Sequence, residues 1–252
     1  MVDVSGIERR VLITGGAGGM GTAIAARFAA GGAKVILADR VPPREDTGNA
    51  WLECDVSDVS SIERLVEQVF REHGTPDVLI NAAGLVIPET FGHVSAESWD
   101  LLFNVNARGA YFCSQLFAPK MSEQGGGVII NIASIAGRAV PQSYPAYSAS
   151  KAALISITQQ LAAALAPKAI RVNAVCPGFI DTPFNHVIDA EIGVKQQGLQ
   201  PGEYLKNVVG KIPLRRAGTP EDIAAYVEFL ASPQASFVTG QSVNIDGGIV
   251  LS

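Results

Sequence analysis

The 252-residue sequence has few cysteines, few charged residues and no long apolar run. Its 3 Cys residues form no CxxC pair, so we expect neither a disulfide framework nor a cysteine-rich metal site, and a reducing cytoplasmic setting is favoured. Only 17% of residues are charged and the net charge is −5, which argues against a nucleic-acid-binding surface with its clustered cations. No segment approaches the roughly 20 apolar residues that span a bilayer, so no membrane partner is expected. The 3 His residues are scattered without metal-ligand spacing, so no metal site is expected.

Apolar runs of strand length alternate with helical stretches along the whole chain. Short runs without internal alternation, such as residues 128–130, are typical of strands covered on both faces. Repeated strand–helix alternation predicts an α/β fold, a doubly wound, Rossmann-type parallel sheet with helices on both faces. The absence of repeats and linker-like composition predicts a single domain over residues 1–252. Strands are expected at 11–13, 34–38, 77–80, 127–132, 171–175 and 242–245, and helices at 22–30, 99–117 and 147–165.

Two segments depart from this alternation. Only 14 residues separate Asp39 from Cys54, and they include Pro42 and Pro43, so this crossover is expected to be short and mostly irregular. Residues 183–213 are polar and weakly periodic, which predicts a mobile flap over the substrate with one or two short helices.

A glycine-rich turn follows the first expected strand and opens the first helix. Two patterns overlap in it: Gly16, Gly18 and Gly21 fit GxGxxG, while Thr14, Gly15, Gly19 and Gly21 fit TGxxxGxG. Such a turn lets the backbone approach a pyrophosphate at a helix N-terminus.

Asp39 ends the next expected strand, near the spacing of a ribose-binding carboxylate. A carboxylate there repels a 2′-phosphate and predicts NAD as the cofactor, whereas the adjacent Arg40 is the argument for NADP.

Tyr147 and Lys151 lie four residues apart at the start of an expected helix, so they share one face with Cβ atoms about 5–6 Å apart. A phenol has a pKa near 10, and a neighbouring ammonium lowers it by stabilising the phenolate. The pair by itself is weak evidence, because this spacing is also common on solvated helix faces.

Further motifs accompany the pair, and together they resemble the classical short-chain dehydrogenase/reductase family over nearly the full length of the chain. The glycine turn is similar to the family's TGxxxGxG, and Ser134 precedes Tyr147 by the usual 13 residues. Gly18 stands where the family often has Ser, and Ala82 replaces the second Asn of its NNAG motif. The other matching segments, in chain order, are Asp55-Val56, Asn81-Ala82-Ala83-Gly84, Asn106, Asn131-Ile132-Ala133-Ser134 and Pro177-Gly178-Phe179-Ile180-Asp181-Thr182.

The resemblance implies a role for each matching residue. Tyr147 would be the general acid/base, Ser134 would bind the substrate oxygen, Lys151 would lower the tyrosine pKa and hold the nicotinamide ribose, and Asn106 would position a water for proton relay. The cofactor-binding residues implied by the resemblance, together with Asp39, are Gly15, Gly19, Met20, Gly21, Asp39, Asp55, Val56, Asn81, Ala82, Gly84, Tyr147, Lys151, Pro177, Gly178, Ile180 and Thr182.

The resemblance therefore predicts a NAD-dependent oxidoreductase that interconverts a secondary alcohol and its ketone. A small or medium alcohol, a polyol, a hydroxyketone or a cyclic diol fits as substrate. The alternatives are an NADP-dependent carbonyl reductase, a non-catalytic nucleotide-sensing protein of the same fold, and an enoyl reductase, whose relatives usually space Tyr and Lys more widely. Family members are commonly tetramers, so a homotetramer is expected. Candidate pocket residues are Val86, Ile87, His93, Ala136, Gln142, Tyr144, Phe179, Phe184, His186 and Val187, with Arg138 as a candidate carboxylate ligand.

Overall fold

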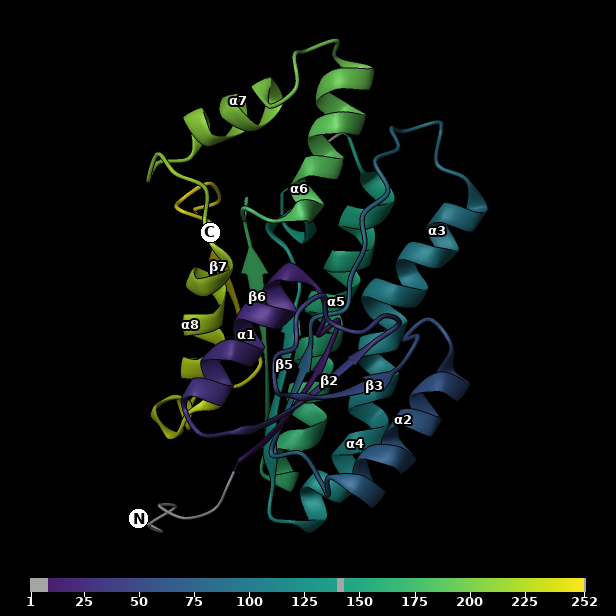
Figure 1. Ribbon diagram of the computed structural model, residues 1–252, viewed down its shortest axis with the longest axis vertical. Helices are drawn as coiled ribbons and strands as arrows, with labels where there is room; N and C mark the ends of the chain where they lie inside the picture. Colours follow the sequence, from purple (N-terminus) through teal and green to yellow (C-terminus); the bar gives the residue numbers. More distant parts are fainter. Residues whose placement is uncertain (1–8, 140–142, 252) are drawn as a thin grey trace.

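The computed structural model describes residues 9–139 and 143–251. A seven-stranded sheet with the order β3-β2-β1-β4-β5-β6-β7 forms its centre (Figure 1), and every neighbouring pair of strands is parallel. This confirms the predicted doubly wound sheet. The strands are β1 (Arg10–Thr14), β2 (Lys34–Asp39), β3 (Ala50–Glu53), β4 (Val78–Asn81), β5 (Gly127–Ile132), β6 (Ile170–Pro177) and β7 (Ser242–Ile245).

Helices cover both faces of the sheet (Figure 1). Side chains of α1 and α8 pack on one face, and those of α2, α4 and α5 pack on the other. Helix α2 shows why: Ile62, Leu65, Val66 and Val69 are buried at helical spacing and form one apolar stripe toward the sheet. The helix bounds are α1 (Gly19–Ala30), α2 (Val59–Glu72), α3 (Ala96–Phe103), α4 (Ala110–Glu123), α5 (Pro145–Leu165), α6 (Pro183–Ile188), α7 (Glu203–Lys211) and α8 (Pro220–Ala231).

The crossover from β2 to β3 is short and contains no helix, as predicted. Sequence patterning predicts no element at β3, α2 or α8, and it predicts one helix over residues 99–117. The structure instead interrupts that helix with a π-helical turn at Asn104–Gly109, between α3 and α4. Apolar periodicity does not distinguish these two helical hydrogen-bond patterns, and such turns are frequent at functional sites.

Residues 183–213 lie beyond the carboxyl ends of the strands (Figure 1). They form α6, a π-helical turn at Asp189–Gln196, and α7. The expected short helices are therefore confirmed, and the mobility of the segment stays a prediction.

Cys54, Cys113 and Cys176 are free and buried in the core. Within the described ranges, no helix combines the length and the apolar character that crossing a membrane requires. The same part of the chain contains no cluster of His, Cys, Asp and Glu suited to a metal ion.

Candidate active site

The candidate site is a cavity of about 310 Å³ at the carboxyl end of the sheet. Strand order reverses there between β1 and β4, where Thr14 pairs with Asn81. Crevices at such reversal points are the usual ligand sites of doubly wound sheets. The cavity is lined by Ser134, Tyr147 and Lys151 together with Met20 of the glycine turn and parts of the segment after β6 and of the flap.

Two positions of the glycine turn, Gly15 and Gly21, leave no room for a side chain. A Cβ on Gly21 would lie 2.2 Å from the Gly15 carbonyl oxygen, and Gly15 has a φ of +69°. Helix α1 begins after Gly18 with no side-chain cap and no acidic residue in its first turn. Its first backbone N–H groups therefore have no partner within the helix, and the residues present fit a bound phosphate group.

Asp39 lies at the end of β2, directly beside this turn. Its carboxylate accepts hydrogen bonds from the Ala17 N–H at 3.0 Å and the Arg40 N–H at 2.7 Å. Asp39 is half-buried, whereas the Arg40 side chain is exposed. The structure thus brings the predicted ribose ligand and the predicted phosphate turn together.

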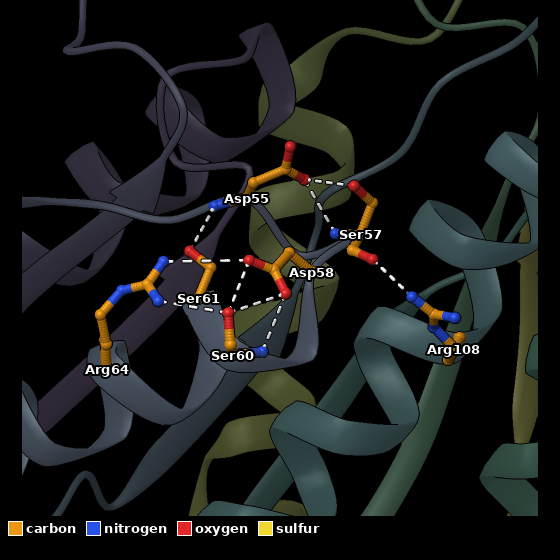
Figure 2. Close-up of polar contacts among 7 residues, drawn as sticks. All are labelled: Asp55, Ser57, Asp58, Ser60, Ser61, Arg64 and Arg108. Carbon is orange, nitrogen blue, oxygen red and sulfur yellow. Dashed lines mark hydrogen bonds and ion pairs between the residues drawn. The ribbon is translucent and has the colours of Figure 1, made fainter.

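Asp55 is held by the turn that precedes α2 (Figure 2). One carboxylate oxygen accepts from the Ser57 N–H at 2.9 Å and the Ser57 hydroxyl at 2.7 Å, and the Asp55 N–H donates to Ser61 Oγ at 3.0 Å. Arg108 in turn donates to the Ser57 carbonyl at 2.6 Å. Figure 2 shows the second carboxylate oxygen of Asp55 pointing away from these partners, so one acceptor remains for a ligand.

The Tyr147–Lys151 pair lies in the first turns of α5, and both side chains are buried. Lys151 Nζ donates to the Ile132 carbonyl oxygen at 2.8 Å and lies 5.9 Å from the centre of the Tyr147 ring. Ser134 follows β5, and its hydroxyl accepts from the Ala136 N–H at 3.1 Å. All three residues line the same cavity.

Burial sets the pKa values of the pair. Burial raises the pKa of Tyr147 to about 12, against a smaller lowering by a hydrogen bond with the Ser134 side chain. The same burial lowers the pKa of Lys151 to about 8. The direction for Tyr147 is opposite to that expected from the Tyr–Lys spacing, because desolvation by burial outweighs the lowering of its pKa by the hydrogen bond with Ser134.

Three hydrogen bonds hold the side chain of Asn106. Its side chain exchanges two hydrogen bonds with the Leu85 backbone, at 2.9 and 3.0 Å, and donates to Ser150 Oγ at 3.0 Å. A Cβ on Gly84 would lie 3.2 Å from Lys151 Nζ and 3.3 Å from Asn106 Oδ1. Gly84 thus allows these two side chains to approach the same stretch of backbone.

Asn81 differs from the other expected cofactor residues. Its side chain is buried and donates to Asn131 Oδ1 at 2.8 Å and Ser114 Oγ at 3.2 Å, which joins β4 to β5 and α4. It does not line the cavity, so a cofactor contact at this position would fall to its backbone. The expected cofactor residues that do line the cavity are Met20, Ala82, Gly84, Tyr147, Lys151, Pro177, Gly178, Ile180 and Thr182.

Only some of the residues expected in the substrate pocket line the cavity. Ala136, Tyr144, Phe179 and Phe184 line the cavity, and Val86 and Ile87 pack behind it. The side chains of His93, His186 and Val187 are exposed and lie outside the lining, because the elements that carry them turn these positions toward solvent. Gln142 lies outside the described residues.

Arg138 does not face the cavity, because its guanidinium donates to the Ser242 carbonyl of β7. Sequence reasoning missed Tyr204, Val208 and Ile249, which reach the cavity from α7 and the C-terminal segment. Nothing in the local sequence pattern around these positions indicated that contact.

Comparisons with known proteins agree with this geometry. A family model described as enoyl-(acyl carrier protein) reductase matches residues 15–250. The chain is 39% identical to galactitol 2-dehydrogenase of Agrobacterium fabrum over 245 residues, 94% of this chain and 95% of the relative. The solved aldohexose dehydrogenase of Thermoplasma acidophilum superposes with a TM-score of 0.89 at 33% identity, covering 96% of this chain and 94% of that one. L-sorbose reductase of Gluconobacter frateurii, solved with NADPH and L-sorbose, gives a TM-score of 0.88 at 31% identity and 97% coverage of both chains.

This chain therefore belongs to the classical short-chain dehydrogenase/reductase family. It is an oxidoreductase of a family that binds a nicotinamide cofactor, and its relatives support alcohol–ketone interconversion.

Proposed function

We propose that this protein is a NAD-dependent dehydrogenase that oxidises a secondary alcohol to its ketone and catalyses the reverse reduction. The observation that carries the proposal is one cavity lined by Ser134, Tyr147 and Lys151 together with Met20 of the glycine turn. A catalytic set next to a nucleotide site would bring an alcohol carbon within reach of a nicotinamide ring.

Tyr147 Oη takes the proton of the alcohol during oxidation and returns it during reduction. The Ser134 hydroxyl donates a hydrogen bond to the substrate oxygen and stabilises negative charge that develops there. When bound, an oxidised nicotinamide would supply a hydride acceptor and a positive charge that favours the Tyr147 phenolate. Lys151 would hold the cofactor ribose, and Asn106 would position a water that passes protons from Lys151 toward solvent.

For the cofactor we propose NAD, because Asp39 places a carboxylate beside the phosphate turn. NADP is the alternative, supported by Arg40 and by the NADPH in the structure of the L-sorbose reductase relative. We propose the cofactor contacts that the resemblance implies. The pyrophosphate contacts Gly15, Gly19, Met20 and Gly21, and the adenosine ribose contacts Asp39. The remaining adenosine and ribose contacts are Asp55, Val56, Asn81, Ala82 and Gly84, and the nicotinamide end contacts Pro177, Gly178, Ile180 and Thr182. Residues 183–213 act as the substrate flap.

The decisive experiment measures initial rates of nicotinamide reduction with NAD and NADP in parallel, on secondary alcohols, polyols and cyclic diols. We expect turnover with NAD, and we expect Tyr147→Phe to lower kcat by about 10³-fold while the Kd for NAD changes less than about twofold, because the phenol acts on substrate.

Higher kcat/KM with NADP would establish the carbonyl-reductase alternative. NAD binding without turnover on any substrate would instead support the nucleotide-sensing alternative. An equal loss of NAD binding in Tyr147→Phe would assign the residue a structural role.

A further inference from the structure

The cavity holds two phenol groups besides that of Tyr147. Tyr144 precedes α5, and its ring packs edge-on against the Tyr147 ring with centroids 5.7 Å apart. Tyr204 reaches the same cavity from α7 and lies near enough to Tyr144 to act on its pKa. Both tyrosines are half-buried.

The position of Tyr204 is held by the flap itself. The buried carboxylate of Asp189 accepts hydrogen bonds from the Gly202 N–H at 2.8 Å and the Leu205 N–H at 3.4 Å, and thereby caps α7. Gly193 packs directly beneath the tyrosine, since a Cβ there would lie 2.5 Å from the Tyr204 Cβ. The backbone that carries Tyr204 is thus joined to the preceding π-helical turn on two sides.

The part of the cavity around Tyr144 and Tyr204 carries no charge from these two side chains. Burial raises the pKa of Tyr144 to about 12, with the neighbouring Tyr204 and Tyr147 acting in the same direction, and burial also raises the pKa of Tyr204. Both phenols therefore stay protonated at neutral pH and can donate a hydrogen bond to an uncharged oxygen.

The surrounding wall is apolar, formed by Phe179, Phe184, Ile188, Val208 and Ile249. Among the described lining residues Lys151 is the one cationic side chain, and it lies at the reacting end. A carboxylate or phosphate on the far part of a substrate would find no cationic partner there to offset the cost of its burial.

We propose that Tyr144 and Tyr204 form a subsite for a second, uncharged oxygen of the substrate. The substrate class is then a compact diol or hydroxyketone, with one oxygen at Ser134 and Tyr147 and the other at the two phenols. This inference rests on the proposed function and names the substrate class of the same site. Tyr144 and Tyr204 are specificity-determining residues that no motif of the family indicates.

Matched substrate pairs test the subsite: cyclohexanol against 1,2-cyclohexanediol, and 2-butanol against 2,3-butanediol. We expect Tyr204→Phe and Tyr144→Phe each to lower kcat/KM for the diol about tenfold, mainly through KM, while the monoalcohol changes less than about twofold. Tyr226→Phe on α8 is the matched control, since Tyr226 lies outside the cavity lining, and it leaves both substrates unchanged. Removing one phenol oxygen preserves the ring packing, and thermal unfolding verifies that each variant is folded.

The competing outcomes are distinct. Equal losses on both members of a pair, no loss on either, or a wild-type preference for the monoalcohol overturns the subsite while the proposed function stands. Absence of wild-type turnover on every pair, with either cofactor, overturns the proposed function and this inference with it. Tyr147→Phe, which abolishes turnover of both members alike, separates loss of catalysis from loss of recognition.

Discussion

At the scale of single residues, Lys151 is a cationic side chain that the fold buries. Only 4% of its surface is exposed, and its amine donates a hydrogen bond to the Ile132 carbonyl. A buried ammonium without a carboxylate destabilises the native state, because desolvation is not offset by an opposite charge. We infer that Lys151 serves the chemistry of the site and not the stability of the chain.

This inference predicts that Lys151→Met stabilises the protein at pH 6, raising Tm by about 4 °C, since Met fills a similar volume without charge. The pKa of Lys151 falls from 10.5 to about 8 on folding, so between those values the unfolded chain binds more protons. The free energy of unfolding of the wild type therefore rises between about pH 8 and pH 10.5. The extra stability of Lys151→Met shrinks over the same range.

Thermal unfolding at pH 6 and pH 10, without cofactor, measures both values. A variant less stable than wild type at pH 6, or an advantage independent of pH, would contradict the assignment.

At the scale of elements, the flap is built from short helices that depend on one another. Helix α7 has 9 residues and no buried side chain, so its own packing contributes little to its stability. It begins after Gly202, whose φ is +83°, and Asp189 supplies the cap from the π-helical turn. The placement of the substrate wall thus depends on one carboxylate that lies outside the cavity lining.

We expect Asp189→Ala to raise the KM for the alcohol about tenfold and to speed proteolysis within residues 197–211, because the N-terminal N–H groups of α7 lose their acceptor. The Kd for NAD is expected to change less than about twofold. Glu191→Ala is the matched control, since Glu191 lies on the same turn but forms an exposed ion pair with Lys195.

Enzyme kinetics, calorimetry and limited proteolysis give the three readouts. If the loss of NAD affinity in Asp189→Ala matched the rise in KM, the flap would belong to the cofactor site as much as to the substrate site.

At the scale of the whole molecule, some exposed apolar side chains lie in loops or on α6 (Val41, Phe91, Val187 and Leu214), and others form two groups. One group lies on α3 and α4 and contains Trp99, Leu101 and Tyr111. The other lies on α8 and in the segments on either side of β7, with Phe229, Phe237 and Leu251, of which Phe237 is fully exposed. Exposed apolar groups of this kind mark interaction surfaces, and two separate ones fit the tetramer that the resemblance predicts.

We therefore expect light scattering to give a mass roughly four times the 26.4 kDa of one chain. Phe237→Glu should reduce it to that of a dimer, because the charge is unfavourable in one apolar interface and leaves the other intact. A wild-type mass of one chain would exclude the tetramer, and an unchanged variant would exclude Phe237 from the interface.

Much of the fold was predictable because its signals are local. Glycines before α1, unalternating apolar strands and the Tyr147–Lys151 spacing each depend on neighbours within a few residues. The π-helical turn around Asn106 and the four-residue strand β3 were not predictable, since one differs from an α-helix only in hydrogen bonding and the other is too short for periodicity.

The sequence by itself determined the doubly wound fold and the family, and it predicted Ser134, Tyr147 and Lys151 as the catalytic residues, because the chemistry requires particular side chains at particular spacings. Only the tertiary structure decided the surroundings of those residues. The tertiary structure directs Arg138 to β7, exposes His186 and buries the Asn81 side chain. It also brings Tyr204 into the same cavity as Tyr147, although 57 positions separate the two residues in the sequence. Motifs follow from reaction chemistry and can be found locally, whereas a substrate wall forms between distant segments and exists only once they have packed.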